Sequence, residues 1–155
     1  MKRLITTILI CIAFAINAQN TAYSDFYKAN KDESQFSMSV PVSLGGFLSD
    51  EEETEEFEEL MKKAEHCKIV IFNNENNTTE RNFKKFSRKK GLKTLMKVRD
   101  GKDKAGIFFI EKDDLVREII IRANSDEEKM VMIGLKITLT KDELASVVTK
   151  ISKDQ

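Results

Sequence analysis

The sequence predicts an α+β fold: a single mixed, mostly antiparallel sheet of about six strands, with helices packed against it and a C-terminal helix. Four strand-like segments follow one another between Leu92 and Leu139. Two more strand-like segments alternate with helical stretches earlier in the chain. An amphipathic helix follows Thr140 at the C-terminal end. Because consecutive strands usually pair as neighbours, the last four are expected to form a meander.

The first residues predict an export signal. A basic start is followed by a nearly uninterrupted apolar run over 4–16, and the chain then turns polar. This run is too short to cross a bilayer, which takes roughly 20 residues. We expect a signal peptide over 1–18, with Ile16 a poor residue at the −3 position, and a single exported α+β domain over 19–155. A buried or membrane-resident N-terminal helix is the alternative.

The composition excludes several classes of protein. Lys and Arg number 26, as do Asp and Glu, so a strongly basic nucleic-acid binder is not expected. The single histidine excludes every site that needs two. Cys11 lies within the apolar run after Ile10, which is not the small residue that a lipoprotein cysteine requires. Signal cleavage leaves Cys67 alone, so no intramolecular disulfide is expected.

The first half of the mature chain alternates helix and strand. Aromatic residues at spacings of three and four predict a short helix over 21–30. Alternating apolar residues predict a strand over 35–42, with Pro41 marking a sheet edge or a strand end. Ser49 and Glu52 form a capping box for an acidic helix whose apolar stripe ends at Ala64. The apolar run 69–72 is typical of a strand covered on both faces.

A second helix and the meander follow. Residues 79–90 are expected to be helical, carrying Phe83 and Phe86 and ending at Gly91. Strands are predicted over 92–99, 105–112, 115–123 and 131–139, with turns at 100–101 and 113–114. In the last strand, alternate residues from Val131 to Leu139 form an apolar core face. Gly134 lies on the other face and indicates a bulge or a close backbone contact.

The C-terminal helix has a capping box of its own. Thr140 and Glu143 have the required spacing, and Leu144 and Val147 begin a core-facing stripe.

Several of the predicted strands and the start of the C-terminal helix resemble the domain-of-unknown-function 4252 family of small exported bacterial proteins. The resemblance is carried by 92–99, 106–110, 118–121, 133–137 and 140–144, although the family's tyrosine near the first of these strands is missing. It implies export and a shared fold, and suggests an accessory role beside envelope-signalling systems. It implies no catalytic or binding residue.

No motif predicts a catalytic, cofactor-binding or metal site, and no cofactor is expected. His66 and Cys67 are adjacent in a strand and point to opposite faces, so they form no dyad. Asp100, Asp113 and Asp114 are turn residues, with a carboxylate active site as the minor alternative. The acidic run over 50–59 is a solvated helix face or a docking surface.

A basic cluster on the second helix has two interpretations. Its residues are interleaved with Phe83 and Phe86, and they are Lys84, Lys85, Arg88, Lys89, Lys90 and Lys93. In an exported protein they form a solvated face or contact anionic lipid or polysaccharide.

We therefore expect a non-enzymatic exported envelope protein, periplasmic or secreted, that acts as a partner-binding or accessory module. An envelope protein is the expected partner; neither nucleic acid nor a stable transmembrane segment is expected. The alternative is a carrier of a small apolar ligand or lipid, which an uncovered face bearing Met130 and Met132 would favour. A hydrolase or lyase that uses carboxylates is a third class.

Overall fold

The computed structural model describes residues 20–41, 62–125 and 128–151. The predicted signal peptide over 1–18, with Cys11, lies outside the described residues. So does most of the predicted acidic helix, including its capping box at Ser49 and Glu52.

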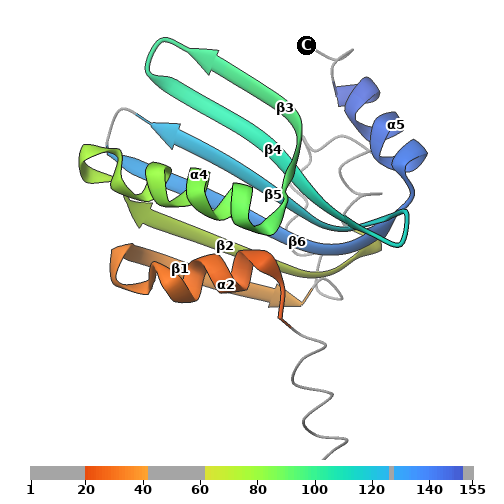
Figure 1. Ribbon diagram of the computed structural model, residues 1–155, viewed down its shortest axis with the longest axis horizontal. Helices are drawn as coiled ribbons and strands as arrows, with labels where there is room; N and C mark the ends of the chain where they lie inside the picture. Colours follow the sequence, from red (N-terminus) through yellow and green to blue (C-terminus); the bar gives the residue numbers. More distant parts are fainter. Residues whose placement is uncertain (1–19, 42–61, 126–127, 152–155) are drawn as a thin grey trace, which may run out of the picture.

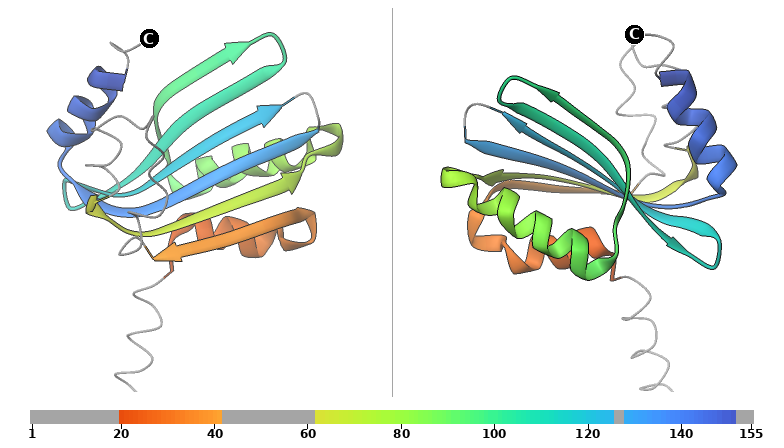
Figure 2. Two further views of the ribbon diagram at one scale, coloured as in Figure 1. Left: turned by 180° about the vertical axis from the view of Figure 1, so that it is seen from behind. Right: turned by 45° about the horizontal axis from the view of Figure 1, so that its top comes forward.

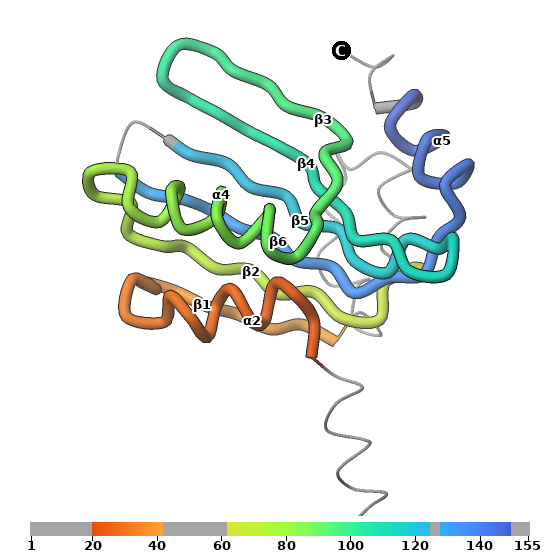
Figure 3. Tube along the Cα trace, in the orientation of Figure 1, coloured from red at the N-terminus to blue at the C-terminus, as the bar shows by residue number. Residues whose placement is uncertain are grey.

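The described elements follow the predicted order, with small shifts at their ends (Figures 1 and 3). In chain order they are α2 Ala22–Ala29, η1 Lys31–Glu33, β1 Ser34–Pro41, β2 Ala64–Asn73, η3 Glu75–Asn77, α4 Thr78–Lys90, β3 Lys93–Asp100, β4 Asp103–Lys112, β5 Leu115–Ser125, β6 Lys129–Leu139 and α5 Lys141–Ile151.

One six-stranded sheet has the order β1-β2-β6-β5-β4-β3, and every neighbouring pair is antiparallel. The predicted α+β class and the meander β3-β4-β5-β6 are confirmed. Pro41 ends the edge strand β1, as predicted, where its missing N–H costs no ladder hydrogen bond. Gly91 ends α4 with a φ of 66°, a left-handed conformation that glycine adopts without strain.

The prediction for Ala64 was wrong. Ala64 was expected to end the acidic helix, but it begins β2, pairs with Ile137 of β6 and is buried in the core. A small apolar residue fits the core-facing pattern of either element, so pairing with β6 decides its conformation.

Helices α2 and α4 lie beside each other on one face of the sheet (Figures 1 and 2). The core beneath them is aromatic and apolar, and comprises Tyr23, Phe26, Val70, Phe72, Phe83, Phe108, Ile120, Met130 and Met132. The condition that would have favoured an apolar-ligand carrier is therefore not met on this face: Met130 and Met132 have no exposed surface. A Cβ at Gly134 would overlap the Tyr23 side chain, which confirms the predicted close contact.

The opposite face carries rows of apolar residues that run across the sheet. One row is Phe36, Ile71, Val131, Ala123, Ala105 and Val98, and the next is Met38, Ile69, Ile133, Ile121, Ile107 and Met96. On the inner strands these residues are half-buried, except the exposed Ala105, and at the edges Phe36, Met38 and Val98 are exposed. The residues packed by α5 through Leu144, such as Val116 and Leu135, are fully buried. In the apolar run of β2, Val70 and Phe72 on one face are thus fully buried, but Ile69 and Ile71 on the other face are only half-buried, in contrast to the predicted coverage of both faces.

The capping box of α5 is confirmed. The Thr140 backbone N–H donates to Glu143 Oε2 at 2.8 Å, and the Glu143 N–H donates to Thr140 Oγ1 at 3.2 Å. Lys63 Nζ lies 2.6 Å from Glu143 Oε1, and this contact with the Thr140 bonds lowers the pKa of Glu143 to about 2. The cap of α5 therefore includes an ion pair with Lys63, a residue 80 positions away in the sequence.

Candidate functional site

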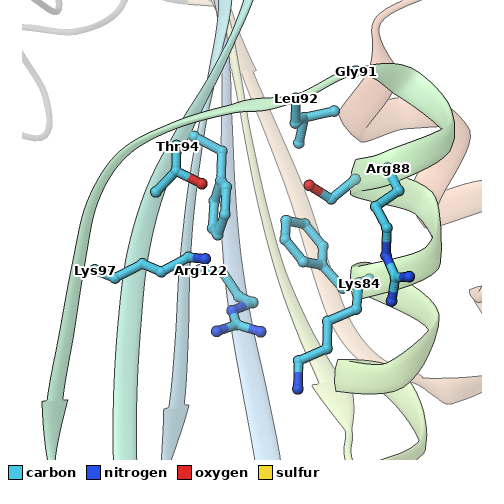
Figure 4. A pocket seen from close by; sticks show the side chains of 10 residues that line it. Lys84, Arg88, Gly91, Leu92, Thr94, Lys97 and Arg122 are labelled. Carbon is cyan, nitrogen blue, oxygen red and sulfur yellow. The ribbon is translucent and has the colours of Figure 1, made fainter.

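A pocket of about 500 Å³ opens between α4 and the strands β3 and β4 (Figure 4). Its lining combines cations, two phenyl rings and small polar groups: Phe83, Lys84, Ser87, Arg88, Gly91, Leu92, Thr94, Lys97, Phe108 and Arg122. Its volume falls in the range of small-molecule sites, roughly 300–1,000 Å³. None of these lining residues is acidic.

Arg122 on β5 is the deepest cation of the pocket. Its side chain is 8% exposed, and its guanidinium carbon lies 5.4 Å from the centroid of the Phe83 ring and 5.9 Å from that of Phe108. Both rings present faces that attract a cation. Burial lowers the pKa of Arg122, and the charge of Glu80 opposes that effect. The guanidinium Nε is buried and forms no hydrogen bond within the described residues.

Glu80 on α4 is the one buried carboxylate beside Arg122 among the described residues. Its Oε1 lies 3.6 Å from Arg122 Nη1, and its Oε2 accepts a hydrogen bond of 3.0 Å from Asn124 Nδ2. Lys104 Nζ is 3.3 Å from Glu80, and Lys84 Nζ is 3.6 Å away. Burial acts to raise the pKa of Glu80, but Lys104, Arg122 and Lys84 together hold it below its usual value.

This network leaves the pocket with an excess of positive charge. Glu80 is shared by three cations, so it neutralises only one of them. Within the parts of the chain that the structure describes, neither Arg88 nor Lys97 forms an ion pair. The Lys97 ammonium lies 6.0 Å from the centroid of the Phe108 ring. An anion is the ligand that this arrangement attracts.

The structure divides the predicted basic cluster. Lys84 and Arg88 line the pocket together with Phe83. Lys90 instead pairs with Asp25 of α2 at 2.7 Å, and Lys93 pairs with Glu111 at 2.6 Å. The remaining members, Lys85 and Lys89, are exposed and do not line the pocket.

Sequence reasoning missed Lys97 and Arg122. Neither belongs to a run of basic residues, and the fold brings them to α4 through the pairing of β3, β4 and β5. One signal was available: Arg122 and Asn124 are in phase with the buried Ile120, so β5 places polar groups on a helix-covered face. A buried arginine requires a counter-charge or a polar ligand.

The other residues considered in the sequence analysis do not come together in a common site. Cys67 is buried, which raises the pKa of its thiol, and it packs on the face opposite α2. His66 is half-buried and its Nδ1 lies 3.0 Å from the hydroxyl of Tyr23. Asp100 lies at the β3–β4 turn, whereas Asp113 and Asp114 lie at the opposite end of β4. The structure therefore does not bring the turn carboxylates together.

Two kinds of feature are absent from the described ranges. No group of three or more His, Cys, Asp or Glu residues there has an arrangement that holds a metal ion. No helix among those residues is long and apolar enough to cross a membrane.

The fold and the pocket define a small α+β protein with a basic surface pocket. The family model described as "Domain of unknown function (DUF4252)" matches residues 23–147. The chain belongs to this family, and the predicted family is confirmed. No curated protein and no solved structure matches the chain.

Proposed function

We propose that this is a non-enzymatic exported protein of the cell envelope, periplasmic or secreted, that binds an anionic group of its partner in the basic pocket. The single observation that carries the proposal is the position of Arg122. It is a buried cation with an unsatisfied Nε, in a pocket whose lining contains further cations and no acid. Such a constellation suits recognition of an anion.

The non-enzymatic part rests on the sequence. The chain has one histidine and none of the common nucleophile, phosphate-loop or metal-protease motifs. The export part rests on the basic start and short apolar run of the first residues. An accessory role in the envelope is consistent with both.

A carrier of a small apolar ligand is the second candidate. It is favoured by the phenyl rings of Phe83 and Phe108 and by Leu92, which line the pocket. The two candidates differ in their dependence on charge, because the proposed binding of an anionic group requires the cations of the pocket, whereas a carrier of an apolar ligand does not.

The test is native mass spectrometry of the protein purified from its own cell envelope. A pocket variant, Lys84→Met with Lys97→Met, removes two lining cations. A matched control, Lys85→Met with Lys89→Met, removes two exposed cations of the same helix that do not line the pocket. We expect an adduct on the wild-type protein and on the control, and its loss from the pocket variant.

Two results would contradict the proposal. An adduct retained equally by all three proteins would place binding elsewhere, and no adduct on any of them would remove its support. The same spectra report the N-terminus: a chain that is not cleaved after Ala18 would contradict the predicted signal peptide.

A further inference from the structure

The two ends of the pocket differ in chemistry. At one end Lys97 reaches from β3 and Lys84 reaches from α4, with Arg122 between them (Figure 4). At the other end lie Leu92 and Gly91, where the chain leaves α4 for β3 (Figure 4). A ligand that fits both ends is an amphiphile with an anionic head and an apolar body.

The edge of the Arg122 guanidinium group that includes Nε determines which head-group geometry fits. Nη1 faces Glu80, whereas the buried Nε has no hydrogen-bond partner. A buried donor without a partner costs free energy that a ligand oxygen recovers. Guanidinium groups bind carboxylate and phosphate oxygens in pairs, so the edge that includes Nε suits an oxyanion with two adjacent oxygens.

The charge of the pocket favours phosphate over carboxylate. Lys84, Arg88, Lys97 and Arg122 line it, and the one nearby buried carboxylate, Glu80, is shared with Lys104. A single carboxylate would leave most of this charge uncompensated. A phosphate monoester carries about −1.5 to −2 at neutral pH and has three acceptor oxygens.

We propose that the pocket binds a phosphate monoester that carries an apolar group. The phosphate lies among Lys84, Lys97 and Arg122, and the apolar group extends over Phe108 toward Leu92. This inference rests on the proposed function, because it specifies which anion that pocket accepts. The pocket volume, about 500 Å³, accommodates a small phosphoester or the head and first carbons of a phospholipid.

The experiment is isothermal titration calorimetry on the mature chain with three soluble probes: hexyl phosphate, hexanoate and inorganic phosphate. We expect hexyl phosphate to bind at least about tenfold more tightly than hexanoate, because the charged head makes more charge-assisted hydrogen bonds. We also expect it to bind at least about tenfold more tightly than inorganic phosphate, because its chain buries apolar surface. Lys84→Met with Lys97→Met abolishes the preference, and Lys85→Met with Lys89→Met preserves it.

Each contrary result has a separate meaning. Hexanoate that binds as tightly as hexyl phosphate, and that is lost in the pocket variant, overturns the phosphate assignment but leaves anion binding intact. If inorganic phosphate binds as tightly as hexyl phosphate, the ligand's apolar group contributes nothing to binding, and that part of the proposal is wrong. If none of the three probes binds, this inference is wrong. The proposed function is then judged by whether an adduct is found on the protein purified from the cell envelope.

A second experiment distinguishes whether the phosphate monoester belongs to a lipid or to a free phosphoester. Vesicles of phosphatidylcholine with and without phosphatidic acid are sedimented with the wild-type and variant proteins. Cosedimentation that requires phosphatidic acid and intact pocket lysines identifies a lipid head group. Binding of hexyl phosphate without cosedimentation identifies a free phosphoester, and cosedimentation that the pocket variant retains contradicts a role for the pocket at membranes.

Discussion

Glu80 of α4 and Arg122 of β5 form a buried ion pair that joins the helix to the sheet beneath the basic pocket. Their Oε1 and Nη1 atoms are 3.6 Å apart, and their side chains are 4% and 8% exposed. Lys104 and Asn124 hold the same carboxylate from β4 and β5. The pair therefore supports both the packing of α4 and the position of the deepest cation in the pocket.

Loss of the Glu80 charge should destabilise the fold. Glu80→Gln leaves Arg122 buried without a counter-charge, and we expect the free energy of unfolding to fall by about 3 kcal/mol, since breaking a buried pair costs that much. Urea unfolding measures the change. Glu75→Gln, which alters an exposed acid in η3, is the control and should change stability little. Equal stability of the two variants would show that the pair has no structural role.

The Glu80 carboxylate should also make the stability of the folded protein sensitive to acid. Cations hold the pKa of Glu80 below its usual value despite its burial, so the unfolded chain takes up the proton first as the pH falls. Its stabilising effect is complete above the unfolded pKa, about 4.3, and is lost as the pH falls through the folded pKa. We expect the stability difference between wild type and Glu80→Gln to shrink below about pH 4.3. A difference that is constant down to pH 2 would contradict this linkage.

Gly134 should not tolerate a side chain. A Cβ there would overlap Tyr23, so Gly134→Ala should cost about 1–3 kcal/mol as an overpacked core. A double-mutant cycle with Tyr23→Gly isolates the contact, because this change removes both the ring and the Cβ of Tyr23 that an alanine at 134 would overlap. We expect Gly134→Ala to cost markedly less in the Tyr23→Gly background. Additive effects in the cycle would show that the two residues are not coupled.

The capping box of α5 should contribute measurably to stability. Thr140→Ala removes the oxygen that accepts the Glu143 N–H, and we expect a loss of about 1 kcal/mol. Ser146→Ala changes an exposed hydroxyl later in the same helix and serves as the control. Thermal unfolding of both variants compares the losses, and a larger loss for Ser146→Ala would contradict a dominant role of the cap.

His66 should titrate below its usual range. Burial and then the charges of Lys68 and Lys136 lower its pKa, so the neutral ring is favoured in the folded state. Burial also raises the pKa of Tyr23 to about 12, and its hydroxyl lies 3.0 Å from His66 Nδ1, where it can donate to a ring whose Nδ1 carries no proton. The resulting stability is complete above the unfolded pKa of about 6.5 and is lost as the pH falls toward the folded value.

Proton NMR follows this histidine without an assignment problem, because the chain has only one. We expect a midpoint below about 6.5 in the wild type and a higher one in Tyr23→Phe, which cannot donate to the ring. A midpoint unchanged by Tyr23→Phe would show that the hydroxyl does not stabilise the neutral ring.

Local signals predicted most of the fold. Thr140 and Glu143 specify a helix start through bonds that span three residues, and Gly91 specifies a helix end through its own backbone conformation. Ala64 failed as a prediction because its environment is set by β6, which is distant in sequence. The sequence left open whether helices cover the face that bears Met130 and Met132, since alternation shows that two faces exist but not which receives the helices.

The sequence by itself determined the elements, the antiparallel meander, the family and the basic character of α4, because each depends on neighbouring residues or on a recurrent pattern. Only the tertiary structure decided the site. Lys84 and Arg88 are near each other in the chain, but Lys97 and Arg122 join them only because β3, β4 and β5 pair in one register and α4 packs across them. Coulomb attraction acts over ångströms of space and not over sequence distance, so the positive pocket and its buried counter-charge exist only in the folded chain.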